Sequence, residues 1–144
     1  MNTVGEILQT KGHQVWSVTP DTSVFEALEL MAEKQIGAVL VIENERVIGV
    51  FSERDYARKV ILKGRSSHTT LVSELMTRKI VYVSPEDKVD ECMALMTAKR
   101  VRHLPVLENH TLLGIVTIGD VVKAIISHQE NTIRELEKYI TGVY

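Results

Sequence analysis

The chain has 144 residues, of which 44% are hydrophobic and 25% charged, which is typical of one folded domain or two small ones and not of a disordered chain. Seventeen basic and nineteen acidic side chains leave a formal net charge of −2, which excludes a global basic field for nucleic acid or anionic membranes. The apolar run of residues 36–42 is far shorter than the roughly 20 residues that cross a bilayer. The start shows no secretory signal, and the single cysteine excludes an internal disulfide. We therefore expect a cytoplasmic protein with no membrane partner.

The chain contains an internal repeat. Residues 15–61 align without a gap on residues 80–126, and a proline and a glycine fall at the same places in both copies. The identical pairs include Pro20 with Pro85, Gly49 with Gly114 and Asp55 with Asp120. Upstream, residues 4–8 resemble residues 72–76, so the first copy carries extra residues around Thr10 to Gln14. Agreement both in these positions and in the pattern of apolar residues indicates a duplication.

A polar linker with Gly and Ser, residues 63–68, separates the copies. We expect a first repeat over residues 1–67, a second over residues 68–128, and a C-terminal helix and tail over residues 129–144. An apolar stripe marks this last helix, formed by Ile133, Leu136 and Ile140. The stripe needs a partner surface, which is either a dimer interface or the helix's own domain.

Each copy begins with the same two elements. Residues 15–18 and 80–83 are short apolar runs that end at a proline, which predicts strands. A helix follows each run, with Thr22 and Asp87 at the expected N-caps. The helical spacing predicts core faces formed by Val24, Ala27 and Met31 and by Val89, Cys92 and Met96.

The rest of each copy reads as a hairpin followed by a second helix. Residues 37–42 and 46–51 flank a Glu-Asn turn in the first copy, and residues 104–107 and 111–116 flank the same turn in the second. The second helices are expected to begin near Glu53 and Ile118, so each copy has the order β-α-β-β-α.

With this order, the chain resembles a tandem pair of cystathionine β-synthase (CBS) domains. The segments that carry the resemblance are Val18-Thr19-Pro20 with Val83-Ser84-Pro85, and residues 49–55 with residues 114–120. The resemblance implies an α/β (α+β) fold in which two repeats pack sheet to sheet about a pseudo-twofold axis. It also implies two clefts that often bind adenine nucleotides, and a homodimer of such pairs.

Four residues at the strand-to-helix junctions form the candidate sites. Ser52 and Thr117 precede helices whose free N–H groups and dipole favour an anion such as phosphate. Asp55 and Asp120, one turn further on, offer carboxylate oxygens to a ribose diol. The alternative is that all four residues only cap their helices.

The resemblance implies that each cleft draws on both copies, with the first strand and the start of the hairpin forming a slot for the base. One cleft would combine Thr19, Ile36, Thr117 and Asp120. The other would combine Ser84, Val101, Ser52 and Asp55.

Basic residues distinguish the two clefts. Arg102 and His103 resemble phosphate contacts in nucleotide-binding relatives, which makes the Asp120 cleft the better site, although a solvated strand edge is the alternative. Arg54 either supplies a cation to the other cleft or obstructs it. We interpret the Lys/Arg cluster of residues 58–65 as a solvated helix face.

The sequence carries no Walker loop, Rossmann fingerprint, nucleophile elbow or paired-histidine zinc motif, and Cys92 lies on a predicted core face. We expect a non-catalytic regulatory module with no metal and no required cofactor. It would bind AMP, ATP, NAD or a similar nucleotide and signal in trans to an unidentified protein target. The alternative is a constitutive dimerisation or interaction module with empty clefts. Nucleic-acid binding through the Lys/Arg cluster is not expected, because the net charge is negative.

Overall fold

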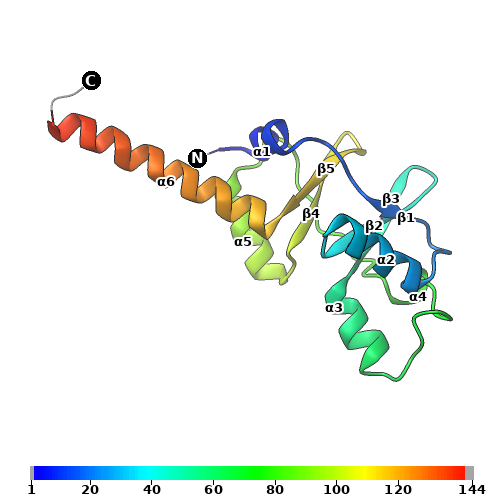
Figure 1. The fold of residues 1–144 in the computed structure, drawn as a ribbon. Helices are drawn as coiled ribbons and strands as arrows, with labels where there is room; N and C mark the ends of the chain where they lie inside the picture. Colours follow the sequence, from blue (N-terminus) through cyan, green and yellow to red (C-terminus); the bar gives the residue numbers. More distant parts are fainter. Residues whose placement is uncertain (1, 142–144) are drawn as a thin grey trace. The chain divides into compact units, whose positions relative to one another are not determined.

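The computed structural model describes residues 2–141, which form two compact units (Figure 1). Unit 1 joins the N-terminal segment, up to His13, with the chain from Val81 onward, and unit 2 comprises Gln14–Ile80. The packing units therefore differ from the sequence repeats, because the first helix of the chain packs with the second copy. Tyr144, in the predicted tail, lies outside the described residues.

Unit 2 is built on a three-stranded sheet. Its strands lie in the order β1-β2-β3, with β1 parallel to β2 and β2 antiparallel to β3. Its elements are β1 (Ser17–Val18), α2 (Val24–Lys34), β2 (Ala38–Glu43), β3 (Arg46–Ser52), α3 (Glu53–Tyr56), the π-helical turn η1 (Ala57–Ile61) and α4 (Val72–Leu75).

Unit 1 is built on the antiparallel hairpin of two strands. Its elements are α1 (Val4–Lys11), α5 (Val89–Lys99), β4 (His103–Glu108), β5 (Thr111–Thr117) and α6 (Ile118–Thr141). Helix α6 is continuous for 24 residues, and Figure 1 shows it extending far from the hairpin that it follows. The order predicted for each copy is confirmed except at the start of the second.

The predicted first strand of the second copy is wrong. Residues 80–83 form no strand, and only Val83 pairs with β4, through a single parallel bridge to Val106. In the first copy, the Leu40 N–H donates to the Trp16 carbonyl oxygen at 3.3 Å and extends the pairing. The position that matches Leu40 is Pro105, which has no N–H to donate, so the pairing cannot extend.

Both predicted hairpins are confirmed, and the turn residues explain them. Asn44 and Glu45 adopt positive φ angles of 52° and 65°, and Asn109 and His110 adopt 51° and 65°. Two consecutive residues with positive φ give the type I′ turn, whose twist matches that of the flanking strands. Asparagine tolerates this region better than most residues, which favours the turn at the same place in both copies.

The predicted N-caps are each wrong by one residue, because Ser23 and Lys88 hold the N-cap positions. Ser23 caps α2, since its side chain accepts a hydrogen bond from the Glu26 N–H at 3.1 Å. Thr22 instead braces the preceding turn, where its hydroxyl accepts from the Thr19 N–H at 3.2 Å. Asp87 does the same in the second copy, accepting from the Ser84 N–H at 2.8 Å. The turn after each proline therefore takes these polar side chains away from the helix.

The predicted helix faces are confirmed, and each unit has its own core. In unit 2, α2 buries Val24, Ala27 and Met31 against a core that includes Phe51. In unit 1, α5 buries its matching face against a core that includes Leu8 of α1 and Leu104. Burial of each large apolar side chain contributes about 1.5–3 kcal/mol.

A glycine in the second hairpin strand lets a helix side chain approach in each unit. A Cβ built on Gly114 would lie 2.9 Å from Cδ2 of Leu8, and one built on Gly49 would lie 2.5 Å from Sδ of Met76, which follows α4. The helix that contacts each glycine, α1 in unit 1 and α4 in unit 2, is also tied to the turn after the proline of its unit. The Gly5 N–H donates to the Pro85 carbonyl oxygen at 2.9 Å, and the Ser73 N–H donates to the Pro20 carbonyl oxygen at 3.2 Å in unit 2.

We predict that Gly114→Ala and Gly49→Ala each destabilise the protein by about 1–3 kcal/mol, because the added methyl overpacks a closed contact. Urea denaturation measures the effect. Gly119→Ala is the matched control, since its Cβ meets only Thr117 Oγ1, at an ordinary 3.7 Å. Adding Leu8→Ala to Gly114→Ala should cost less than the sum of the two single changes, and strict additivity would contradict this packing.

Candidate functional site

A reciprocal capping pair fixes each of the two predicted carboxylates. The Thr117 N–H donates to Asp120 Oδ2 at 2.9 Å, and the Asp120 N–H donates to Thr117 Oγ1 at 3.2 Å. In unit 2, the Ser52 N–H donates to Asp55 Oδ2 at 3.0 Å, and the Asp55 N–H donates to Ser52 Oγ at 3.2 Å. The capping role that we weighed for these four residues is therefore confirmed. It also places both carboxylates rigidly in the first turn of a helix.

A lysine that the sequence analysis did not select holds the carboxylate in unit 1. Lys11, in the last turn of α1, donates from Nζ to Asp120 Oδ2 at 2.6 Å and to the Ile115 carbonyl oxygen at 2.9 Å. The docking of α1 on β5 thus delivers a cation to the start of α6. A signal was present in the sequence, because Lys11 lies in the segment where the first copy carries extra residues.

The charges around Asp120 set its pKa and that of His103. Burial would raise the pKa of Asp120, but the hydrogen bonds from Lys11 and Thr117 lower it overall, so the carboxyl group stays ionised. Burial and the nearby charges of Lys11 and Arg102 lower the pKa of His103. His103 is therefore neutral at pH 7, and Lys11 supplies the fixed positive charge that His103 does not.

The residues predicted around Asp120 within the second copy converge on one edge of unit 1. His103, at the start of β4, pairs in register with Thr117 at the end of β5. Arg102 is exposed, and its carbonyl oxygen accepts a hydrogen bond from the N–H of Ile118, the first residue of α6, at 2.9 Å. This hydrogen bond joins the residue before β4 to the first residue of α6.

Unit 2 holds its carboxylate differently. Asp55 is buried, with 8% of its surface exposed, and Lys59 Nζ lies 3.1 Å from its Oδ1. Lys59 also donates to the Leu75 carbonyl oxygen of α4 at 3.0 Å. Our interpretation of residues 58–65 as a solvated face is wrong for Lys59. The alignment places Ala124 opposite Lys59, which explains why the two units use different lysines.

The remaining predicted site residues divide between the units. Ser84 and Val101 lie in unit 1 and are half-buried. Thr19, Ile36 and Arg54 lie in unit 2, where Thr19 and Arg54 are exposed. The sharing of a cleft by residues from both copies stays a prediction.

Cys92 lies in the core of unit 1 as predicted. Burial, reinforced by the negative charges of Asp87, Glu91 and Asp90, raises the pKa of its thiol to about 11. A thiol with such a pKa is almost fully protonated at neutral pH and is a poor nucleophile. Its role is packing.

Comparison with known proteins agrees with the repeat and the fold. The family model for the CBS domain matches residues 4–62 and 72–127. The chain is 38% identical over 152 residues to the CBS domain-containing protein CBSX3, mitochondrial, of Arabidopsis thaliana, covering 99% of this chain and 73% of that protein. A solved protein with CBS domains from Burkholderia ambifaria MC40-6 shares 50% identity and a TM-score of 0.86, over 89% of this chain and 96% of that one. The CBS-domain protein ATU1752 from Agrobacterium tumefaciens shares 41% identity and a TM-score of 0.82, over 85% and 98%.

The chain therefore belongs to the CBS domain family and carries two CBS domains in tandem. Such pairs are generally regulatory, ligand-binding modules. Within residues 2–141, no helix has the length and apolar character needed to cross a membrane.

We predict that Lys11→Met lowers the free energy of unfolding by about 1 kcal/mol at pH 7, since it removes a partly exposed charged hydrogen bond. The pKa of Asp120 lies below its ordinary value of 3.8 in the folded protein, so this stabilisation is present above that value and is lost as pH falls through the folded pKa. The difference between variant and parent should therefore shrink in acid. Denaturant titrations at several pH values measure it.

The matched control is Lys79→Met, which removes an exposed lysine that follows α4, the helix of unit 2 that matches α1. It should change the free energy of unfolding by no more than about 0.5 kcal/mol. An equal loss in both variants, or a loss for Lys11→Met that persists unchanged in acid, would contradict the assigned role of Lys11.

Proposed function

We propose that this chain is a non-catalytic sensor that binds an adenine nucleotide, such as AMP, ATP or NAD, at the Asp120 edge of unit 1. The observation that supports the proposal is an ionised carboxylate, fixed by backbone capping and paired with Lys11, at the start of a long helix. Free N–H groups and the dipole at a helix start favour anions, while an ionised carboxylate accepts strong hydrogen bonds from hydroxyl groups. A nucleotide offers both kinds of group.

The hydrogen bonds around Asp120 assign the parts of the ligand. Lys11 and the Thr117 N–H both donate to Oδ2, so we assign the ribose hydroxyls to Oδ1. Because His103 is neutral at pH 7, we assign the phosphate to the cations Arg102 and Lys11. His103 then acts as a neutral hydrogen-bonding partner instead of a cation.

The Ser52, Arg54 and Asp55 edge of unit 2 is the weaker site in this proposal. Asp55 is more buried than Asp120, and both of its oxygens are engaged, Oδ2 by Ser52 and Oδ1 by Lys59. A ribose there would have to displace Lys59. Base binding stays with the residues to which the family resemblance assigns it, which are Thr19 and Ile36 for one cleft and Ser84 and Val101 for the other.

In this proposal the sensor signals to a protein target in trans. We also propose a homodimer acting in the cytoplasm without a metal or a required cofactor. The second candidate function is a constitutive interaction module, which the exposed apolar face of α6 favours.

We predict that AMP, ATP or NAD raises the melting temperature of the purified chain in a saturable way, because a ligand of the folded state stabilises it by mass action. At a ligand concentration of 100 times Kd, the gain is about 2.7 kcal/mol. Thermal-shift titration and calorimetry measure it, with GMP and inorganic phosphate as comparison ligands. If the folded chain binds none of these nucleotides, the constitutive module becomes the better description.

We predict that Asp120→Asn weakens the binding of that nucleotide by about 10-fold or more, because a charged acceptor becomes neutral. The amide oxygen still accepts from the Thr117 N–H, so the helix start is retained. Asp55→Asn is the matched control in the other unit and should change the affinity by less than about 2-fold, which is within ~0.5 kcal/mol. Calorimetry on both variants, with melting curves to show that they fold, decides whether Asp120 carries the site.

A further inference from the structure

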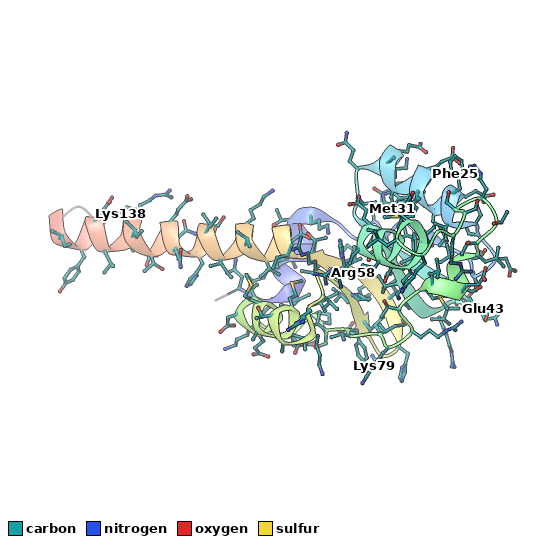
Figure 2. The ribbon with its side chains drawn as sticks, turned by 90° about the horizontal axis from the view of Figure 1, so that it is seen from below. Phe25, Met31, Glu43, Arg58, Lys79 and Lys138 are labelled. Atoms are coloured by element: carbon teal, nitrogen blue, oxygen red, sulfur yellow. The ribbon has the colours of Figure 1, made fainter. Side chains whose placement is uncertain are left out.

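The outer half of α6 carries an apolar stripe that its own unit leaves uncovered. The inner part of the helix packs Val121, Ala124 and Ile125 against the core of unit 1, whereas every residue from 129 to 140 is exposed. Figure 2 shows this part projecting from the unit as far as the labelled Lys138, with no other described element of unit 1 beside it. An isolated helix of fewer than about 12–15 residues is marginal in water, so this segment needs a partner.

The spacing of the stripe specifies another helix as that partner. Its members are Val122 (39% exposed), Ile126 (49%), Gln129, Ile133 (55%), Leu136 (56%) and Ile140 (82%). Steps of four and three residues alternate along this set, which is the heptad pattern of a coiled coil. The isoleucines at 126, 133 and 140 hold the a positions, and Val122, Gln129 and Leu136 hold the d positions. In parallel coiled coils, β-branched residues at a with leucine at d favour two helices over three or four, and Leu136 is the leucine among the d positions.

We propose that α6 pairs with α6 of a second copy of this chain, in a parallel, in-register coiled coil over residues 122–140. In this arrangement each stripe residue faces its own counterpart, so Gln129 meets Gln129 of the second copy and the two amides bond to each other. An antiparallel pairing would place Gln129 against Ile133 and leave a buried amide without a partner, which costs about 1–3 kcal/mol. The single polar position therefore fixes both register and direction.

An open hollow on the surface of α6 fits the same partner. It is lined by Ile118, Gly119, Val122, Lys123, Ile126, Ser127 and Glu130. Residues 119, 122, 123 and 126 among them have the spacing of the four-residue hole that receives one side chain from a facing helix.

The charges of the projecting segment argue against a membrane as the partner. Its charged side chains are Glu130, Arg134, Glu135, Glu137 and Lys138, three acidic and two basic. Helices that lie on anionic lipid surfaces carry a polar face rich in lysine and arginine. This segment lacks that excess.

Cysteine cross-linking tests the direction and the register. Leu136→Cys places a thiol at a d position, where it lies opposite its counterpart only in the parallel, in-register pair. We expect mild oxidation to convert most of this variant to a disulfide-linked dimer. The matched control, Asn131→Cys, points away from the stripe and should remain monomeric on a non-reducing gel. The native Cys92 does not interfere, because it is buried.

Failure of Leu136→Cys to cross-link, or equal cross-linking of both variants, would overturn the proposal. Cross-linking of Ile126→Cys with Leu136→Cys in a mixture, without self-linking of Leu136→Cys, would instead show an antiparallel pair.

Sedimentation equilibrium tests the affinity independently. Ile133→Asp buries a charge at the interface and should raise the dissociation constant of the dimer by about 10-fold or more. Asn131→Asp introduces the same charge outside the stripe and should leave the constant unchanged. Circular dichroism checks that both variants keep the folded units, since residue 133 lies outside either core. An unchanged dissociation constant for Ile133→Asp would rule out pairing through α6.

Discussion

The contact between a helix side chain and a glycine in the neighbouring hairpin organises each unit. Leu8 reaches Gly114 in unit 1, and Met76 reaches Gly49 in unit 2, at distances that leave no room for a side chain on the glycine. Each contact docks a helix on the second strand of a hairpin, the strand that leads directly into a capped carboxylate. The position of that helix therefore determines which groups surround the carboxylate.

The two units reach the same electrostatic result by different routes. In unit 1, α1 carries Lys11 directly to Asp120. In unit 2, α4 presents the Leu75 carbonyl oxygen, which accepts from Lys59, and Lys59 in turn pairs with Asp55. An ionised group in the first turn of a helix thus has a lysine partner in both cases. The outcomes differ in exposure, since the side chain of Asp120 is 22% exposed and that of Asp55 only 11%. Duplication has preserved the carboxylate and left one copy more open to a ligand.

The repeat made most of the architecture predictable from sequence, because each pattern appeared twice. The hairpins, their turns and the buried helix faces depend on local spacing, which survives in both copies. The packing of α1 on the second copy was not predictable, since residues 4–8 and 72–76 are alike and local pattern does not say which hairpin each helix covers. Lys11 was missed for the same reason, because its partner lies more than a hundred residues away. The short pairing at Val83 was predictable in principle from Pro105, which interrupts the ladder.

In the proposed sensor, the ion pair between Lys11 and Asp120 would link a nucleotide at α6 to the docking of α1, and the small free energy of this pair limits what it can transmit. A nucleotide that shares Lys11 would loosen one tie of α1 to the rest of unit 1. Partly exposed ion pairs contribute about 0.2–1 kcal/mol, whereas couplings between sites are typically about 1–3 kcal/mol. The ion pair alone therefore contributes too little free energy to account for a typical coupling between two sites. The remaining coupling has to come from contacts that respond along with it, and the bond between Ile118 and Arg102, which joins the hairpin to the start of α6, is placed to respond. A ligand held by both Arg102 and Asp120 would act on the two ends of that junction at once, and α6 would carry the change outward along its length.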